Sequence, residues 1–589
     1  MSGLHVSRLI SDHMILQHSK PVHLWGKADP GKGVKAVLSG EDAVLSESAT
    51  ADEKGDWSLF LPSMKPSDRP HELEITDEAG GRIVIRDVLI GEVWFASGQS
   101  NMDLMMERVR DRYPDEIRDC DEPRIRCFKI AEHTDYHGPL AEPLTGEWMC
   151  ASRDTIMQFS ATGYFFSKTY LATTGIPVGF LHASLGGSCI WGWMNREMLA
   201  SPSDAMPKGY TDYLDEAARY ADDSFLAGQI ALNEKNAAAW NAELERREKE
   251  GHDLREAKLN VPCFFRDMSE LRGFIGKISI KKRFVLTDEM LKNAAYFGTG
   301  SDGTGPDGAA SATAGGQQTR IRLFLGTLVD RDEVFINGTK VGETGYQYPP
   351  RKYDVPLTIL RAGENEVEIR LGVETGAGRL TPDKKYSILC ERGDAVTKRD
   401  TGGFVVEGED GVLWDIDLSG EWTYRILARM EEAVPPTDFV NWHPTGLYNG
   451  MAAPCIFYTI DGFLWYQGEA NADFATLPED TCQRKEDYED LMRRLIHGWR
   501  DLWNTHSEME ATTQPFLYVM LPNFTVDLDE RGKKQWALIR KQQEACLNEP
   551  LTAMVNAVGL GCDNDLHPHE KEEIGTKLAA LALEIKGHI

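Results

Sequence analysis

Residues 88–102, VLIGEVWFASGQSNM, decide the fold of this 589-residue chain. Residues Val88–Ala96 are almost all apolar, which is typical of a strand that is buried on both faces of a parallel sheet. Gly98-Gln99-Ser100 follows directly and predicts a strand-to-helix turn that exposes the Ser100 hydroxyl at the carboxyl edge of the sheet. The main-chain N–H groups at the start of the next helix would be available to an oxyanion there. The motif is not GxSxG, so the nucleophile elbow of the common α/β-hydrolases does not apply.

Further apolar strands alternate with helical stretches on both sides of this segment. They include Pro177–His182, Phe463–Tyr466, Pro515–Leu521 and Met554–Val558. Alternation of this kind predicts one α/β domain with a parallel sheet and helices on both faces.

Two other parts of the chain are β-rich. Residues 1–88 contain short apolar or alternating runs between turn-rich stretches, and they predict a small β-sandwich. Residues 263–440 are β-rich again, with a hairpin expected at Asn337-Gly338. We therefore expect an α/β domain formed by residues 89–262 and 441–589 and interrupted by a β insertion. Residues 212–257 predict one or two long exposed helices.

Composition limits the possible partners. Lys and Arg total 64 against 93 Asp and Glu, a formal charge of −29. Such a chain repels polyanions, so we expect neither nucleic acid nor a membrane as a partner. The N-terminus lacks the pattern of a signal peptide, and ten scattered cysteines fit a reducing compartment. We therefore expect a cytoplasmic protein.

Three more motifs lie at predicted strand ends. Ser184-Leu185-Gly186-Gly187-Ser188 has paired glycines, which let main-chain N–H groups approach a ligand closely. Trp465-Tyr466-Gln467-Gly468-Glu469-Ala470-Asn471 offers side-chain amides that could donate to an oxyanion.

The last motif is Asp563-Asn564-Asp565-Leu566-His567-Pro568, ahead of an amphipathic stretch. Pro568 suits the first position of a helix, and His567 at the helix start would then be kept neutral by the helix dipole. His567 and His569 could ligate a metal, but no third ligand stands at short spacing, so we expect none.

The order Ser, Gly, amide, Asp/His resembles the SGNH hydrolases and, within them, the sialate O-acetylesterases. The resemblance covers nearly the whole length. It is carried by LISDHMILQHSKPVHLW, GEVWFASGQSNM, LHASLGGSCIWGWM, LYNGMAAP, FLWYQGEAN and DLHPHEKEEIGTKLA. It implies an SGNH-type, flavodoxin-like parallel sheet. The stretch Thr327–Val373 resembles the sugar-binding, galactose-binding-like jelly-roll module of glycosidases.

The resemblance also implies roles for individual residues. Ser100 would be the nucleophile and His567 the base, in a serine esterase that needs no cofactor. The usual position of the orienting Asp holds Asn564, so we expect Asp565, with Asp563 as the alternative, to complete the triad. The oxyanion would be held by Ser100, Gly187 and an amide, for which we prefer Gln467 to Asn471. Substrate contacts are expected from five residues near these motifs, namely Gln99, Asn101, Trp191, Tyr466 and Glu469.

The expected reaction is removal of acetyl groups from a sugar, either sialic acid or another acetylated glycan such as xylan. Two rival interpretations remain open. The chain could be a carbohydrate-binding protein on an inactive esterase scaffold, although the Ser100–His567 pair is intact. It could also be a glycosidase, although no convincing pair of catalytic carboxylates is apparent.

Overall fold

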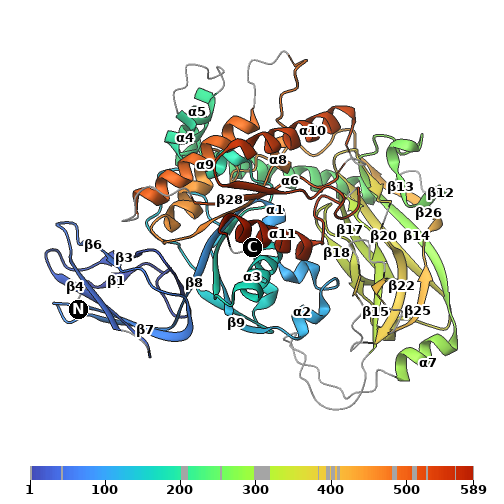
Figure 1. The fold of residues 1–589 in the computed structure, drawn as a ribbon. Helices are drawn as coiled ribbons and strands as arrows, with labels where there is room; N and C mark the ends of the chain where they lie inside the picture. Colours follow the sequence, from blue (N-terminus) through green and yellow to red (C-terminus); the bar gives the residue numbers. More distant parts are fainter. Residues whose placement is uncertain are drawn as a thin grey trace.

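The structure is a computed structural model of the whole chain (Figure 1). The residues that it describes are 3–41, 44–200, 210–251, 255–296, 319–382, 384–392, 398–399, 405–407, 411–480, 487–506, 514–524, 528–563 and 565–587.

A parallel sheet forms the centre of the molecule. Its strands lie in the order β11-β8-β27-β28-β29, and every neighbouring pair in this run is parallel. The bounds are Val178–Ser184 for β11, Arg82–Gly98 for β8, Gly462–Tyr466 for β27, Phe516–Val519 for β28 and Thr552–Val555 for β29. Beyond β11 the sheet is extended by β9 (Asp121–Lys129), which is parallel, and by β10 (Trp148–Ser152), which is antiparallel. The predicted parallel α/β sheet is confirmed.

Helices cover both faces of this sheet because its strands are apolar on both faces (Figure 1). Trp94 and Ala96 of β8 share one core cluster with residues of α3 (Ala161–Thr174) and α11 (Lys571–Ile585). Val93 and Phe95 share the other cluster with residues of α9 (Tyr488–Thr505) and α10 (Glu530–Ala545). Successive side chains of a strand point to opposite faces, so this one strand contributes to both cores.

The N-terminal part is built from two sheets. One contains β1 (His5–Val6), β3 (Val22–Lys27) and β6 (Asp56–Leu61), and the other joins β2 (Ile15–Gln17), β4 (Gly33–Ser39), β5 (Val44–Thr50) and β7 (Ser67–Asp77) to β8. Strand β8 pairs with β7 through Arg82–Ile90 and with β11 from Glu92 onward. The border expected at residue 88 therefore falls inside one continuous strand.

The insertion is built mainly from two antiparallel sheets around their own core, with a small three-stranded sheet and a two-stranded sheet beside them. The predicted hairpin is confirmed, since Asn337 and Gly338 have φ values of 50° and 83° between β17 and β18. The larger sheet contains β12 (Ala257–Val261), β26 (Gly420–Arg429), β14 (Gly276–Leu286), β20 (Gly363–Val373), β17 (Arg331–Ile336) and β18 (Thr339–Thr344). The smaller one contains β19 (Lys352–Asp354), β15 (Thr319–Leu325), β22 (Tyr386–Arg392) and β25 (Val412–Asp417).

The sheets of the insertion do not start and end where the sequence suggested. The one or two helices expected within 212–257 are present as α5 (Tyr210–Tyr220) and α6 (Asp223–Glu250), and residues 257–261, for which no strand was expected, form β12. Strand β12 pairs with β26, so the β sheet begins at 257 and not at 263, and its last strand ends at 429 and not near 440. The short strand was missed because it directly follows a long helical pattern. In the described parts of the chain, no helix is both long and apolar enough to cross a membrane.

An ion cluster joins the insertion to the α/β domain close to the Gly98–Ser100 turn. Asp111 accepts two hydrogen bonds of 2.9 Å from the Arg322 guanidinium and one of 3.0 Å from Lys352. These two cations hold the pKa of Asp111 well below its usual range. Because all three groups are largely buried, loss of the Asp111 carboxylate would leave two cations facing each other in the interface.

Candidate active site

Ser100 lies at the turn between β8 and the short helix α1 (Ser100–Asp103), as predicted. Gly98 has a φ of 138°, and a Cβ atom there would lie 2.2 Å from the main-chain oxygen of Tyr466. Only glycine therefore fits at this position, and Gln99 N can donate to that same oxygen at 3.0 Å. The tight contact between β8 and β27 directs the chain into the turn that presents Ser100.

His567 lies beside Ser100, although 467 positions separate them in the sequence. The distance from His567 Nε2 to Ser100 Oγ is 2.7 Å, which is hydrogen-bond distance. Burial, together with the nearby Lys571 and Arg108 cations, lowers the pKa of His567 to about 3. The imidazole is therefore neutral near pH 7 and able to accept the proton of the hydroxyl.

The reason for the neutral imidazole differs from the expected one. Helix α11 begins at Lys571 with Glu570 as its N-cap, so Pro568 is not in the helix and His567 is not at its start. The helix was placed too early because Pro568 is a common first helical residue. Burial, not the helix dipole, is the main cause of the lowered pKa.

The glycine motif lies against the nucleophile. A Cβ atom on Gly186 would be 3.7 Å from the Cβ atom of Ser100, in ordinary van der Waals contact. Gly187 has a φ of 77°, and a Cβ atom there would lie 2.0 Å from the Trp442 ring. These two positions therefore allow the main chain to pass close to both Ser100 and Trp442.

The two amides that follow β27 are in different bonding states. Gln467 Nε2 donates to the Ser188 main-chain oxygen at 3.1 Å and to Asn471 Oδ1 at 2.7 Å, so both of its hydrogens are used. Asn471 Oδ1 also accepts from Ile190 N, but buried Asn471 Nδ2 has no hydrogen-bond partner among the described residues. The geometry therefore favours Asn471 over Gln467 as a donor to a bound group, which reverses the preference drawn from the sequence.

The two candidate orienting carboxylates differ in exposure. Asp563 is exposed and accepts a hydrogen bond from Asn523 Nδ2 at 3.2 Å. Asp565 is buried, and its Oδ2 makes no hydrogen bond although Lys384 Nζ of the insertion lies 3.7 Å away. No carboxylate among the described residues hydrogen-bonds to Nδ1 of His567, and Asn564 lies outside those residues.

Asn101 and Glu469, which were expected to touch the substrate, belong to a polar cluster under the nucleophile. Asn101 Nδ2 donates to Glu469 Oε1 at 2.5 Å and to the Leu566 main-chain oxygen at 2.9 Å. Asn101 Oδ1 accepts from Lys571 Nζ at 2.6 Å. Burial lowers the pKa of Lys571 to about 7 and raises the pKa of Glu469. Asn101 is fully buried, so it cannot contact a sugar directly.

The three other predicted contact residues are also largely buried. Gln99 Oε1 accepts from the N–H groups of Gly468 and Ala470, so its side chain braces the β27 turn. Tyr466 is fully buried, with Lys571 Nζ 4.8 Å from its ring centre, and it does not line the cleft. Trp191 does line the cleft, as Gln99 and Glu469 do.

Ser100 and His567 open into a cleft of about 1330 Å³. Its walls include residues that the motifs did not reveal, because they come from the insertion and from loops after the core strands. Tyr348 of the insertion packs edge-on against His567, with ring centres 5.5 Å apart. The other cleft-lining residues that the motifs did not reveal include Arg108, Tyr346, Phe439, Trp442 and Phe474.

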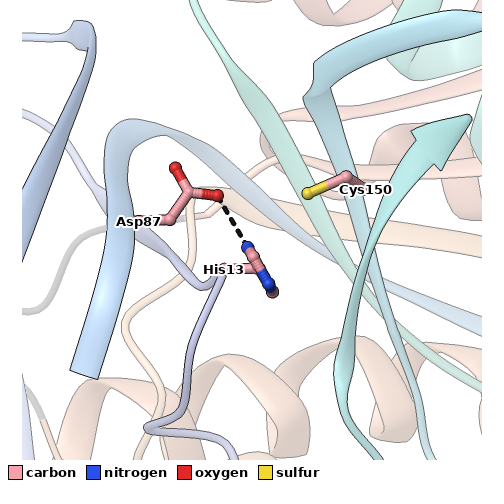
Figure 2. A group of neighbouring side chains, drawn as sticks. All are labelled: His13, Asp87 and Cys150. Atoms are coloured by element: carbon pink, nitrogen blue, oxygen red, sulfur yellow. Dashed lines mark hydrogen bonds and ion pairs between the residues drawn. The ribbon is translucent and has the colours of Figure 1, made fainter. Parts of the chain in front are cut away.

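One group of potential metal ligands occurs in the described part of the chain, away from these residues. His13, Asp87 and Cys150 have ligand atoms within 4.8 Å of one another (Figure 2). His13 Nδ1 lies 2.6 Å from Asp87 Oδ2, and the Arg126 guanidinium donates to both oxygens of the same carboxylate at 3.0 Å. The Arg126 charge opposes a cation there, and none of the three ligand-type residues lines the cleft.

Comparison with known proteins agrees with this geometry. Residues 430–584 match the family described as carbohydrate esterase, sialic acid-specific acetylesterase. The sialate O-acetylesterases of Mus musculus and Homo sapiens are 24% and 23% identical over 212 and 211 residues. These alignments cover 33% of this chain and only 38% and 40% of the relatives.

A carbohydrate acetylesterase from Xanthomonas citri has the same overall fold. Its crystal structure matches with a TM-score of 0.53 at 18% identity, covering 100% of this chain and 76% of that one. The fold match and the family match thus both make the chain similar to carbohydrate esterases. Within that class, the matched part of the chain is similar to the sialate O-acetylesterases named above, and it spans well under half of their length.

Proposed function

We propose that the chain hydrolyses O-acetyl esters of sugars, either sialic acid or another acetylated glycan, with Ser100 as nucleophile and His567 as base. The 2.7 Å contact between Ser100 Oγ and a neutral, half-buried His567 at the carboxyl edge of a parallel sheet is the observation that carries this proposal. A hydroxyl in contact with a neutral imidazole is the arrangement that makes serine a nucleophile.

The reaction proceeds in two steps. Ser100 Oγ attacks the acetyl carbonyl carbon while its proton passes to His567 Nε2, and the resulting imidazolium gives that proton to the departing sugar oxygen. Water then attacks the acetyl-serine, loses its proton to His567 and releases acetate, which regenerates Ser100. The balance is one ester and one water giving one alcohol and one acetic acid, and no cofactor takes part.

The oxyanion formed in each step needs hydrogen-bond donors. Ser100 is the first residue of α1, so its N–H has no partner within the helix. The N–H of Gly187 and the uncommitted Nδ2 of Asn471 are the other donors that we propose. In this scheme Gln467 holds the Asn471 amide in place through the 2.7 Å hydrogen bond.

Asp565 is the group that we propose to orient His567 and to stabilise the imidazolium. It is buried and lies two residues from His567 in the chain, whereas Asp563 is exposed and bonded to Asn523. The two neighbouring cations make imidazolium formation costly, so a carboxylate that offsets them would assist catalysis.

The fold supports a finer architectural proposal. When the added edge strands β9 and β10 are left aside, the order β11-β8-β27-β28-β29 corresponds to second, first, third, fourth and fifth along the chain, which is the flavodoxin-like order. We infer that the α/β domain is of the SGNH type and that the insertion is a jelly-roll module. Ser100 and Gln467 then follow the adjacent strands β8 and β27, at the switch point of the sheet, where ligands bind in such folds.

The test is acetate release by the purified chain from p-nitrophenyl acetate, O-acetylated sialic acids and acetylated xylo-oligosaccharides, with Ser100→Ala as the control. We expect turnover of p-nitrophenyl acetate and of at least one sugar ester, and none by the control. A folded chain that binds sugars but releases no acetate would instead be a binding protein. Release of p-nitrophenol from aryl glycosides would indicate a glycosidase.

A further inference from the structure

The cleft around Ser100 and His567 is larger than one acetylated sugar needs. Its volume of about 1330 Å³ exceeds the ~300–1,000 Å³ that usually holds a drug-sized ligand. The insertion supplies one wall through Tyr346 and Tyr348, and the segment after β26 supplies another through Phe439 and Trp442. The cleft therefore has room for sugar units beyond the one that carries the acetyl group.

Exposed aromatic side chains are concentrated in this cleft. Tyr346, Tyr348, Phe439 and Phe474 are each 42–53% exposed. They are the aromatic members of the exposed large apolar side chains in the described residues, and all four line the cleft. Exposed apolar surface gathered in a groove indicates a binding site, and flat rings suit the apolar C–H face of a sugar.

Two of these rings are supported from behind. Phe439 stacks on Trp442 with ring centres 3.9 Å apart, and Phe474 packs edge-on against Trp191 at 5.3 Å. Trp442 borders Gly187, whereas Tyr348 borders His567. Aromatic surfaces thus lie on two sides of the reacting pair, as needed to hold a chain of sugars on both sides of the acetylated unit.

The charge of the lining is strongly negative. Eight Asp and Glu side chains line the cleft against two Arg, Arg108 and Arg379. Addition of three cations near the lining carboxylates, namely Arg331 beside Glu374, Lys129 beside Asp103 and Lys571 near Glu469, still leaves eight carboxylates against five cations. Such a field repels an anionic sugar, whereas carboxylates accept hydrogen bonds from the hydroxyls of a neutral one.

We infer that the substrate is an uncharged acetylated oligosaccharide, bound through sugar units on both sides of the acetylated one, and not a free sialic acid. This inference rests on the proposed esterase function and narrows its substrate class. The carboxylate of sialic acid would have to enter the acidic cleft and pair with one of two lining Arg side chains. Arg108 already donates to the Tyr346 hydroxyl at 3.1 Å, and Arg379 donates to the Ala377 main-chain oxygen at 3.3 Å.

The first experiment compares kcat/KM for acetylated xylo-oligosaccharides and O-acetylated sialic acid. Hydrolysis of p-nitrophenyl acetate, which carries no sugar, reports the activity of the catalytic groups without sugar binding. We expect the oligosaccharide to be preferred by at least about tenfold, and only the sialic acid rate to rise with salt as the repulsion is screened. Equal or better turnover of sialic acid would overturn the inference. Failure on p-nitrophenyl acetate would overturn the proposed function itself.

The second experiment tests the aromatic surfaces. Phe439→Ala and Phe474→Ala should each lower kcat/KM at least about tenfold more on the oligosaccharide than on p-nitrophenyl acetate. Val285→Ala, which removes an equally exposed apolar side chain of β14 outside the cleft, should change neither. Equal effects of the Phe variants on both substrates, or no effect on the oligosaccharide, would overturn the inference.

Discussion

The side-chain amide of Asn101 donates to the main-chain oxygen of Leu566 at 2.9 Å, and this bond joins the residue after Ser100 to the residue before His567. Two loops that are far apart in the sequence are thereby fixed to each other next to the reacting atoms. Lys571 and Glu469 bond to the same amide and hold it in a single orientation. We interpret Asn101 as a positioning residue for the Ser100–His567 pair.

Asn101→Ala should therefore lower kcat about tenfold or more with little change in KM, because misplacement of catalytic groups affects the transition state most. The measurement is steady-state hydrolysis of p-nitrophenyl acetate, with circular dichroism to establish that the variant folds. Asn548→Ala is the matched control, since that amide bonds only to its own loop at the surface. An unchanged kcat in Asn101→Ala would remove the positioning role.

The oxyanion assignment can be tested by a ranking. Asn471→Ala removes an amide nitrogen with no partner in the described structure, so kcat should fall about 10²-fold with KM nearly constant. Gln467→Ala should cost less, because both hydrogens of that amide already bond within the protein. A greater loss in Gln467→Ala would return the oxyanion role to Gln467.

The strand that leads to Ser100 and the turn that presents it could be predicted from the sequence, because local patterns determine both. The apolar run of β8 predicts a strand buried on both faces, and the Gly98 turn places Ser100 at its end. The hydrogen bonds that a side-chain amide makes, by contrast, depend on residues that are distant in the sequence. Whether Gln467 or Asn471 is available depends on Ser188 and Ile190, which come from another strand end, so spacing alone could not rank the two amides.

The orienting carboxylate is tested by isosteric replacements. Asp565→Asn should lower kcat at least about 10²-fold, since a triad that depends on its carboxylate can lose up to about 10⁴. Asp563→Asn should lower kcat by less than about tenfold, because that side chain is exposed and bonded to Asn523. If Asp563→Asn is the more damaging, the triad assignment is wrong. If neither matters, the enzyme works as a Ser100–His567 dyad.

The pH dependence of the reaction tests the state of the base. The pKa of His567 is lowered from 6.5 to about 3, mainly by burial. A lowered pKa keeps the imidazole neutral to lower pH, so the acid limb of kcat/KM should lie well below pH 6.5. The profile is measured with p-nitrophenyl acetate, and circular dichroism at each pH separates loss of activity from unfolding. An acid limb centred at pH 6.5 would contradict the neutral, half-buried base.

The cleft walls could not be predicted from the motifs. Tyr346 and Tyr348 stand in the insertion, more than two hundred residues from both Ser100 and His567, and no local pattern marks them as part of the site. They reach it because Asp111 pairs with Arg322 and Lys352 and fixes the insertion beside the nucleophile turn. Asn101 and Tyr466 were predicted to contact the substrate because they lie in the motifs, but both are buried. Membership of a motif does not imply access to the cleft.

The central claim is that the acetyl group passes through Ser100, and its direct test is to map the covalent intermediate. The chain is mixed with p-nitrophenyl acetate, quenched during the first turnovers, digested and examined by mass spectrometry. We expect one acetyl group on the peptide that contains Ser100, none in Ser100→Ala, and a loss of at least about 10³-fold in kcat for that variant. An acetyl group on a different residue, or a Ser100→Ala variant that keeps more than about a tenth of the activity, would contradict the account.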